Sequence, residues 1–237
     1  EYMKDMFSVD LLKGHFENYL IIFKNFKIGQ YLFNTLLVTV LKLVFTMPLA
    51  IFASYAFAKL RFRGKNAMYP LIISAMFIPF QVIMIPVYTM LTKLHMIDTY
   101  RGLILVTGTI GIPSSIMLLS SSFRSIPNEL LEAAAIDGCG YFRKIFHIMI
   151  PMGKPAIAIC TIMGFISSWN DLLPPMVIIK SVNKRLVMPA LDGLVSMYNA
   201  DTPFQLTGIL IAAVPAIAIY LILSKQIIMG ISAGSTK

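Results

Sequence analysis

Long uncharged stretches set the strongest limit on how this 237-residue chain folds. Three of them, Asn66–Thr92, Gly102–Phe123 and Thr202–Ser224, contain no Asp, Glu, Lys or Arg. Each is at least as long as the roughly 20 mostly apolar residues of a helix that crosses a bilayer. Charged residues make up only 13% of the chain, against about 25% in a soluble domain. The sequence therefore predicts an all-α membrane protein and excludes a soluble globular domain.

Five segments are expected to span the membrane. We expect helices rather than barrel strands, because the segments lack alternation and exceed the roughly 9–11 residues of a tilted strand. The second segment carries three prolines, and the fourth is short because Lys154 and Asp171 bound it closely. The expected spans are Leu32–Ala58, Ala67–Thr92, Gly102–Phe123, Pro155–Asn170 and Pro203–Ser224.

The basic residues orient these spans. Lys59, Arg61, Arg63 and Lys65 lie close together between the first two spans, and an excess of Lys and Arg marks cytoplasmic loops. The loop 124–154 and the tail 225–237 are then cytoplasmic, whereas residues 1–31 and the loop 180–202 are external. The net charge of +9 is explained by lipid headgroups, so no nucleic-acid partner is predicted. Five spans that end inside start outside, and with no initiator Met or signal sequence we expect a sixth, amino-terminal span beyond this sequence.

The external segment 1–31 has its own pattern. Phe16, Tyr19, Leu20, Phe23 and Phe26 recur at three- and four-residue spacing. This spacing predicts an amphipathic helix that lies at the membrane surface.

The long loop 124–154 is the most informative stretch. Ser125 is a candidate N-cap, Pro127 suits a first turn, and Gly138 suits a helix stop, so a helix is expected over Pro127–Asp137. This helix is too short to cross a bilayer. Its small residues, Ala133 to Ala135, would let another protein approach closely. A second short helix is expected after Gly140, and the pattern fits a docking element or an ordinary interfacial loop.

The same loop resembles a known family. Glu132-Ala133-Ala134, then Gly138 and Ile148, then Ile150-Pro151 are similar to the EAA loop of permease subunits of binding-protein-dependent ABC importers. The family pattern is Glu-Ala-Ala-x3-Gly-x9-Ile-x-Leu-Pro, and only Ile150 departs from it. The sequence Glu132-Ala-Ala-Ala-Ile-Asp137-Gly138 is similar to that of the carbohydrate branch of this family, typified by the smaller maltose-permease subunit. The resemblance extends through Asn34, Trp169-Asn170-Asp171 and the tail Gly230–Gly234.

The resemblance implies a type I ABC importer transmembrane domain over residues 32–224. It implies that the loop contacts a cytoplasmic ATPase and that the tail contacts the ATPase dimer. The expected partners are a homologous permease subunit, two ATPase subunits and an extracytoplasmic binding protein that touches the loop 180–202. ATP and Mg²⁺ would be held by the ATPase, because this chain has no Gly-x4-Gly-Lys-Ser/Thr motif. The implied coupling residues are Glu132, Ala133, Ala134, Asp137 and Gly138, and the implied tail contacts are Gly230, Ser232 and Gly234.

Three residues are candidates for the substrate path. Short or broken membrane segments often line transport sites, and the fourth span loses helical character near Trp169 and Asn170. Trp169 would then stack on the face of a sugar, and Asn170 would form hydrogen bonds with its hydroxyl groups. In the alternative interpretation, Trp169 is an aromatic residue of the membrane interface, and Asn170 and Asp171 only cap the helix. Gln81, between Pro79 and Pro86, is the third candidate. Lys42 is costly in hydrocarbon, and we expect it to reach outward to the interface.

Other classes of protein would require other residues in the sequence. An ion-coupled secondary transporter needs a buried carboxylate, and Asp171 is the nearest one to a span. An ABC permease for peptides or amino acids is a further alternative. Gly230-Ile-Ser-Ala-Gly234 matches the Gly-x-Ser-x-Gly motif of hydrolases, but a membrane helix precedes it where that motif needs a strand. We expect no catalytic residue, no metal site and no bound cofactor in this chain.

Overall fold

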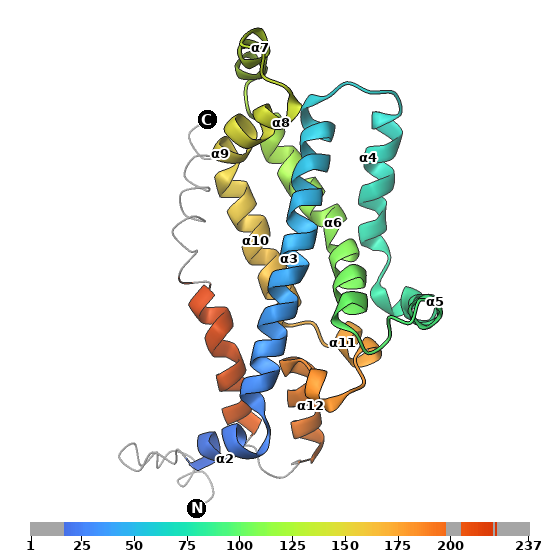
Figure 1. Cartoon of the computed structure of the whole chain (residues 1–237), viewed down its shortest axis with the longest axis vertical. Coiled ribbons are helices and arrows are strands. Elements are labelled where there is room, and N and C mark those ends of the chain that lie inside the picture. The colour runs from blue at the N-terminus through green and yellow to red at the C-terminus, as the bar shows by residue number, and fades with distance from the viewer. Residues whose placement is uncertain (1–16, 198–204, 220, 222–237) are drawn as a thin grey trace, which may run out of the picture.

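Two long helices form the centre of the fold (Figure 1). The computed structural model describes residues 17–197, 205–219 and 221, in which all regular structure is helical. Helix α3 (Ile28–Lys59) runs the length of the bundle, and α6 (Tyr100–Arg124) packs along it. A Cβ added at Gly108 would lie 2.7 Å from the Phe45 ring, so glycine lets the two helices approach closely. In the described part, these two are the unbroken helices that are long and apolar enough to cross a membrane.

The predicted second span is not one helix. Helix α4 (Lys65–Ser74) continues through the 3₁₀ turn η1 (Ala75–Phe77), and the chain then bends by 98° into α5 (Phe80–Lys93). Pro79 causes the break, because it lacks an N–H and disfavours a helical residue before it. Ile78 is accordingly extended, with φ −89° and ψ 107°. The predicted span Ala67–Thr92 is therefore built of two helices that meet at a sharp bend, not of one straight helix.

The fourth span is short and bent at its start. A helical segment that includes a π-helical stretch runs over 141–152, and at Gly153 the axis turns by 79° into α10 (Lys154–Trp169). Helix α10 ends before Asp171, as the sequence indicated. The elements of this region are α8 (Tyr141–Lys144), η2 (Ile145–Met149), α9 (Ile150–Met152), α10 and then α11 (Leu173–Ile178).

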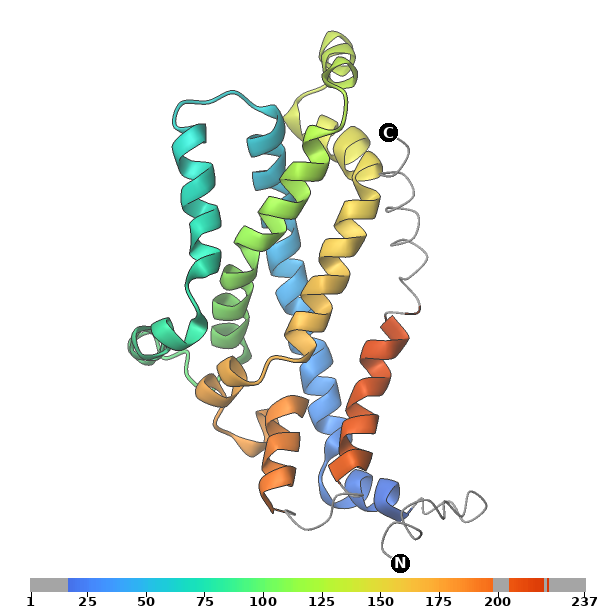
Figure 2. The same ribbon diagram turned by 180° about the vertical axis from the view of Figure 1, so that it is seen from behind.

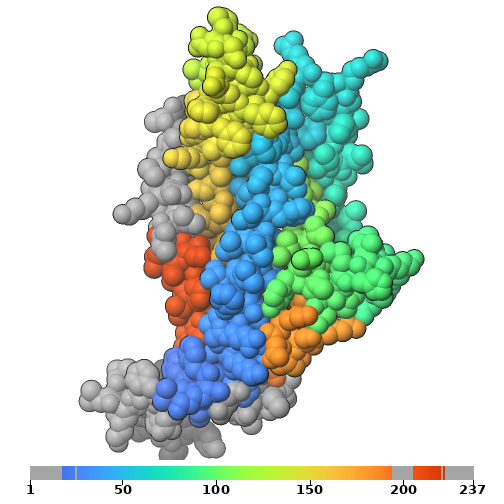
Figure 3. Space-filling view, viewed as in Figure 1, coloured from blue at the N-terminus to red at the C-terminus, as the bar shows by residue number. Residues whose placement is uncertain are grey.

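Two groups of short elements lie at opposite ends of the bundle (Figures 1 and 2). Helix α7 (Asn128–Ile136) projects beyond one end, and in the space-filling view this region protrudes at the top of the molecule (Figure 3). Helices α2 (Glu17–Asn25) and α12 (Val187–Met197) lie at the other end, with the 3₁₀ turn η3 (Val182–Lys184) between α11 and α12. The loop around Glu132 is thus far from the segment 182–197.

The expected surface helix and the last span are present in part. In α2, Ile22 is fully buried, whereas Leu20 and Phe23 are 60% and 53% exposed. One side of α2 therefore packs on the bundle and the other presents apolar side chains outward, as an interfacial helix does. Phe16 lies outside the described residues. Of the fifth span, the structure describes an apolar helix over Gln205–Ile219.

Candidate functional site

Helix α7 is anchored on the bundle through its inward face. Leu131 and Ala134 are buried, and Leu131 belongs to a cluster of buried apolar residues that includes Tyr55 of α3, Phe123 of α6 and Met149 of η2. Residues three apart share a helix face, so Ala134 points into the bundle with Leu131. The expectation that Ala134 belongs to an exposed surface of small residues is wrong, whereas Glu132, Ala133 and Asp137 are exposed.

The start of this helix differs from the prediction. Ser125 is the C-cap of α6, and its hydroxyl donates to the carbonyl of Ser122 at 2.7 Å. Pro127 precedes the first helical residue, and α7 has no side-chain N-cap. Lys59, at the end of α3, instead holds the connection between α6 and α7. Its Nζ donates to the carbonyl of Ile126 and to Oδ1 of Asn128, the latter at 2.9 Å.

Gly138 ends α7 as predicted. Its φ is +76°, a conformation that glycine adopts without the steric penalty of a Cβ. The Cys139 N–H donates to the Ala134 carbonyl at 2.8 Å, and the Gly138 N–H donates to the Ala135 carbonyl at 3.1 Å. These two bonds form a Schellman motif, which satisfies the last carbonyls of the helix. The exposed Glu132 and Asp137 are thus presented on a helix of defined length.

A partly buried ion pair joins α3 to the break after α10. Nζ of Lys42 lies 3.4 Å from Oδ2 of Asp171, and the side chains are 8% and 28% exposed. One turn away, the Thr39 hydroxyl donates to the Ser168 hydroxyl at 3.2 Å. The prediction that Lys42 reaches outward to the interface is wrong. A cation within an apolar span costs about 2.5–3.5 kcal/mol, and the Asp171 carboxylate offsets this cost.

Two adjoining cavities lie beside this pair. The inner cavity, of about 230 Å³, lies between α3, α6 and α10, and the outer cavity, of about 240 Å³, extends toward the α4–α5 break. The two cavities share four lining residues, which are Lys42, Gly111, Ser114 and Ser167. The outer cavity is also lined by Asp171 and Phe80. Together they form a space beside the long helix α3 whose mainly apolar walls carry a few polar side chains.

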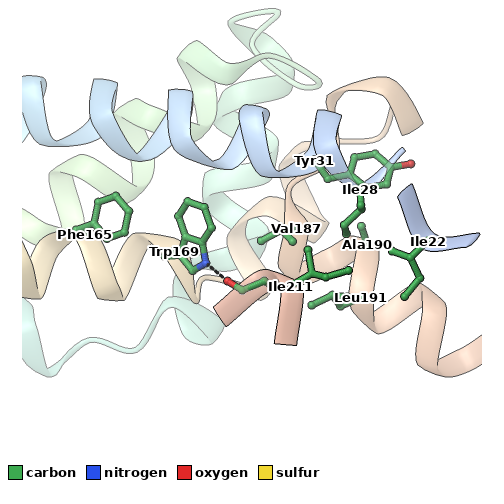
Figure 4. Close-up of a cluster of buried hydrophobic side chains, with 10 residues drawn as sticks. Ile22, Ile28, Tyr31, Phe165, Trp169, Val187, Ala190, Leu191 and Ile211 are labelled. Carbon is green, nitrogen blue, oxygen red and sulfur yellow. Dashed lines mark hydrogen bonds between the residues drawn. The ribbon is translucent and has the colours of Figure 1, made fainter. Parts of the chain in front are cut away.

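The predicted substrate-path residues lie elsewhere. Trp169 is 2% exposed, stacks on Phe165 and donates from Nε1 to the Ala212 carbonyl at 3.0 Å (Figure 4). Its indole packs in the core, away from either cavity. Asn170 Nδ2 donates to the Ile166 carbonyl at 2.9 Å, which caps α10. Gln81 is exposed on α5, and its neighbour Phe80, rather than Gln81, borders the outer cavity.

The sequence analysis did not predict that Lys42 pairs with Asp171 or that Ser167 lines the cavities beside them. The signal was present, because an ionisable residue within a membrane helix needs a partner. Asp171 is the acidic residue closest to a span in the sequence, which makes it the natural partner for Lys42.

The opposite end of the bundle is held by a polar network around Asp98. Its carboxylate accepts from the hydroxyl and the N–H of Ser181, from the N–H of Lys180 and from Nζ of Lys184. The hydrogen bonds from Ser181, supported by Lys184 and Lys180, hold the pKa of Asp98 far below its ordinary value. The loop after α5 is thereby fixed to the segment around η3.

Asn34 reinforces this end. Its Nδ2 donates to the carbonyls of Asn183 and Arg185, each at 3.0 Å. The Thr35 hydroxyl accepts from the N–H of Val187 at 2.8 Å. The start of α3 therefore carries the segment that leads into α12.

The predicted tail contacts, Gly230, Ser232 and Gly234, lie outside the described residues. Among the residues that the structure describes, no group of three or more His, Cys, Asp or Glu side chains is arranged to hold a metal ion.

Comparison with known proteins identifies the family. Residues 46–231 match the family described as binding-protein-dependent transport system inner membrane component. The chain belongs to this family. It is a membrane transport subunit and not an enzyme, and its EAA-like loop lies within the matched region.

Individual relatives agree with this family. The arabinooligosaccharides transport system permease protein AraQ of Bacillus subtilis (strain 168) is 30% identical over 94% of this chain and 79% of its own length. The diacetylchitobiose uptake system permease protein NgcG of Streptomyces coelicolor (strain ATCC BAA-471 / A3(2) / M145) is 29% identical over 93% and 74%. A crystal structure of a bacterial ABC transporter involved in the import of alginate, an acidic polysaccharide, superposes with a TM-score of 0.76 and 25% identity, and covers 89% of this chain and 79% of that one. The permease fold is that of type I ABC importers.

Proposed function

We propose that this permease is a subunit of an ATP-driven importer for a sugar or oligosaccharide. The names of AraQ and NgcG support the class of solute, since both describe carriers of oligosaccharides. The subunit would form half of the translocation path beside a homologous permease subunit. An extracytoplasmic binding protein would deliver the sugar, and two ATPase subunits would hold ATP and Mg²⁺.

We further propose that α7 is the contact with the ATPase. The observation that carries this proposal is its exposed outer face: Glu132 and Ala133 are exposed on a helix that projects beyond the bundle (Figure 1). Glu132 would pair with a basic residue of the ATPase, and Asp137 and Gly138 would shape the end of the contact. The tail residues Gly230, Ser232 and Gly234 would add a second contact.

The packing under α7 offers a route for the motion. Leu131 contacts a cluster that includes Tyr55 of α3, Phe123 of α6 and Met149 of η2. A shift of α7 on closure of the ATPase dimer would therefore be transmitted to η2 and onward to α10. Movement of α10 against α3 would open the path alternately to each side of the membrane.

Purification of the tagged chain from membranes tests the proposal. Wild-type chain should bring down an ATPase, and the reconstituted complex should couple ATP hydrolysis to sugar uptake. Glu132→Lys should reduce both the recovery of the ATPase and uptake at least ten-fold, because loss of a charge-assisted contact costs about 1.5–3 kcal/mol. Membrane insertion should be unchanged.

A milder variant, Glu132→Gln, removes the charge without reversing it. Its matched control is Glu129→Gln, since Glu129 lies one turn earlier on the same helix and is also exposed. The control should retain the ATPase. Normal uptake by Glu132→Lys, or equal losses in the two glutamine variants, would argue against α7 as the coupling element. Uptake without ATP would instead favour an ion-coupled transporter.

A further inference from the structure

We propose that Lys42 and Asp171 form a sugar-binding contact within this chain and select uncharged sugars. This inference rests on the proposed function and adds the charge class of the solute. It also states that this subunit contacts the solute itself.

The pair has unused hydrogen-bonding capacity toward the outer cavity. The ammonium of Lys42 has three donors, and one of them points to Oδ2 of Asp171 at the long distance of 3.4 Å. Among the described residues, Oδ1 of Asp171 accepts no hydrogen bond, and this side chain is 28% exposed. A hydroxyl group of a sugar can both donate to the carboxylate and accept from the ammonium. The pair therefore matches the hydrogen bonding of a sugar hydroxyl.

The surrounding side chains suit the same ligand. Ser114 and Ser167 line both cavities and add hydroxyl groups, and Phe80 adds an aromatic ring to the outer one. Binding sites for small polar molecules combine an apolar lining with a few placed polar groups. Here Ser114 and Ser167 line the cavities beside the ion pair, and Phe80 lines the outer cavity.

The charges of the cavity walls determine which solutes fit. Lys42 and Asp171 are the charged residues among the described lining of the two cavities, and their charges cancel. An acidic sugar would place its carboxylate beside Asp171 and compete with it for Lys42. An uncharged sugar meets no such repulsion, so the pair favours uncharged solutes.

The pair also offsets the cost of placing Lys42 in an apolar span, so a structural role has to be separated from a sugar contact. Replacing a buried ion pair with apolar residues of similar size is often neutral or stabilising, whereas removing one partner is strongly destabilising. The double variant Lys42→Met/Asp171→Asn is therefore expected to fold. It separates a sugar contact from a structural role.

The test uses the complete importer in detergent, without its binding protein. Ser114→Cys places a thiol in the wall of both cavities, and its modification by a charged thiol reagent is followed by peptide mass spectrometry. Ser121→Cys, exposed on the same helix outside both cavities, is the matched control. The probes are arabinotriose and diacetylchitobiose as uncharged sugars and an alginate trisaccharide as an acidic one.

We expect at least one uncharged sugar to slow modification at position 114 but not at position 121. In the double variant, the sugar concentration for half-protection should rise about ten-fold or more, as expected for lost charge-assisted hydrogen bonds. The single variant Asp171→Asn, assayed in importer that still copurifies with its ATPase, should gain protection by the alginate trisaccharide, because Lys42 then lacks its counter-charge. A merely structural pair would not produce this change of preference.

Three results would overturn the inference. They are equal protection of the wild type and the double variant, better protection by the acidic probe in the wild type, and no protection by any sugar. Each leaves the proposed function intact if an ATPase copurifies and drives sugar uptake. Absence of the ATPase would instead remove the proposed function itself.

Discussion

At one end of the bundle the body of α7 rests on apolar side chains, and Lys59 bonds only its first residue, Asn128, and the connection before it. At the other end a carboxylate and several amides join the loops. Leu131 sits in a cluster with Tyr55 and Phe123. Asp98, in contrast, gathers hydrogen bonds from Lys180, Ser181 and Lys184. The apolar contact is non-directional, but charge-assisted hydrogen bonds fix distance and angle.

This difference indicates how the two ends can serve transport. A helix held by apolar packing can shift on its neighbours while it keeps most of its buried area. A loop held through Asp98 cannot shift without breaking several bonds at once. We infer that the end with α7 is built to move and that the end with Asp98 is built as a fixed frame.

The largest effect is expected from Leu131→Ala, which removes the apolar anchor of α7. A Leu→Ala change in a packed core costs about 2–5 kcal/mol, and here the cost falls on the docking of α7. Amide hydrogen exchange over residues 128–137 of the purified importer should become faster by orders of magnitude. The change should depend little on salt, since no charge is removed.

Leu130→Ala is the control for this variant. Leu130 neighbours Leu131 but is 42% exposed, so its truncation should leave hydrogen exchange near the wild-type rate. Equal acceleration in both variants would contradict the view that one face of α7 is the anchor.

An intermediate effect is expected from Asp98→Asn at the opposite end. Asparagine tolerates the positive φ of 58° at this position, but it loses the charge that binds Lys184. The loss should be about 1–2 kcal/mol and should appear as faster hydrogen exchange over residues 178–187. Added salt should screen the attraction between Asp98 and Lys184, so that hydrogen exchange in the wild type approaches that in the variant.

The pH dependence of this end follows from the lowered pKa of Asp98. Its contribution is fully present above the unfolded pKa of about 3.9 and is lost as the pH falls through the lower folded value. Hydrogen exchange at 178–187, corrected for its intrinsic pH dependence, should therefore change below about pH 4 in the wild type and not in Asp98→Asn. Asp137→Asn, exposed at the other end, should keep the wild-type profile. Loss of the acid response in that control would show that Asp98 is not its source.

Local signals in the sequence predicted some elements well. Gly138 ends α7 because the required backbone conformation is a property of that one residue and its neighbours. The lengths of α3 and α6 follow from their apolar runs in the same way. Ser125 was misassigned because a serine suits the end of one helix and the start of the next, and geometry decides between them.

Features that depend on packing between distant segments were not predictable in this way. Lys42 and Asp171 are 129 positions apart, and no local pattern states that they meet. Tryptophan is a residue type that stacks on sugars, yet the helix over Gln205–Ile219 covers Trp169. The break at Pro79 was visible as a proline, but the 98° turn that follows it was not.

The smallest effect is expected from Gly138→Ala at the end of α7. The left-handed conformation costs an L-residue about 1 kcal/mol, while the site itself is open, with no atom within 4 Å of an added Cβ. The amide of Cys139, which donates to Ala134, should therefore exchange about five-fold faster. Gly140→Ala is the matched control, since its surroundings are equally open and its φ is −71°. A loss as large in the control would mean that any side chain added in this turn weakens the end of α7, and that the left-handed conformation of Gly138 is not the cause.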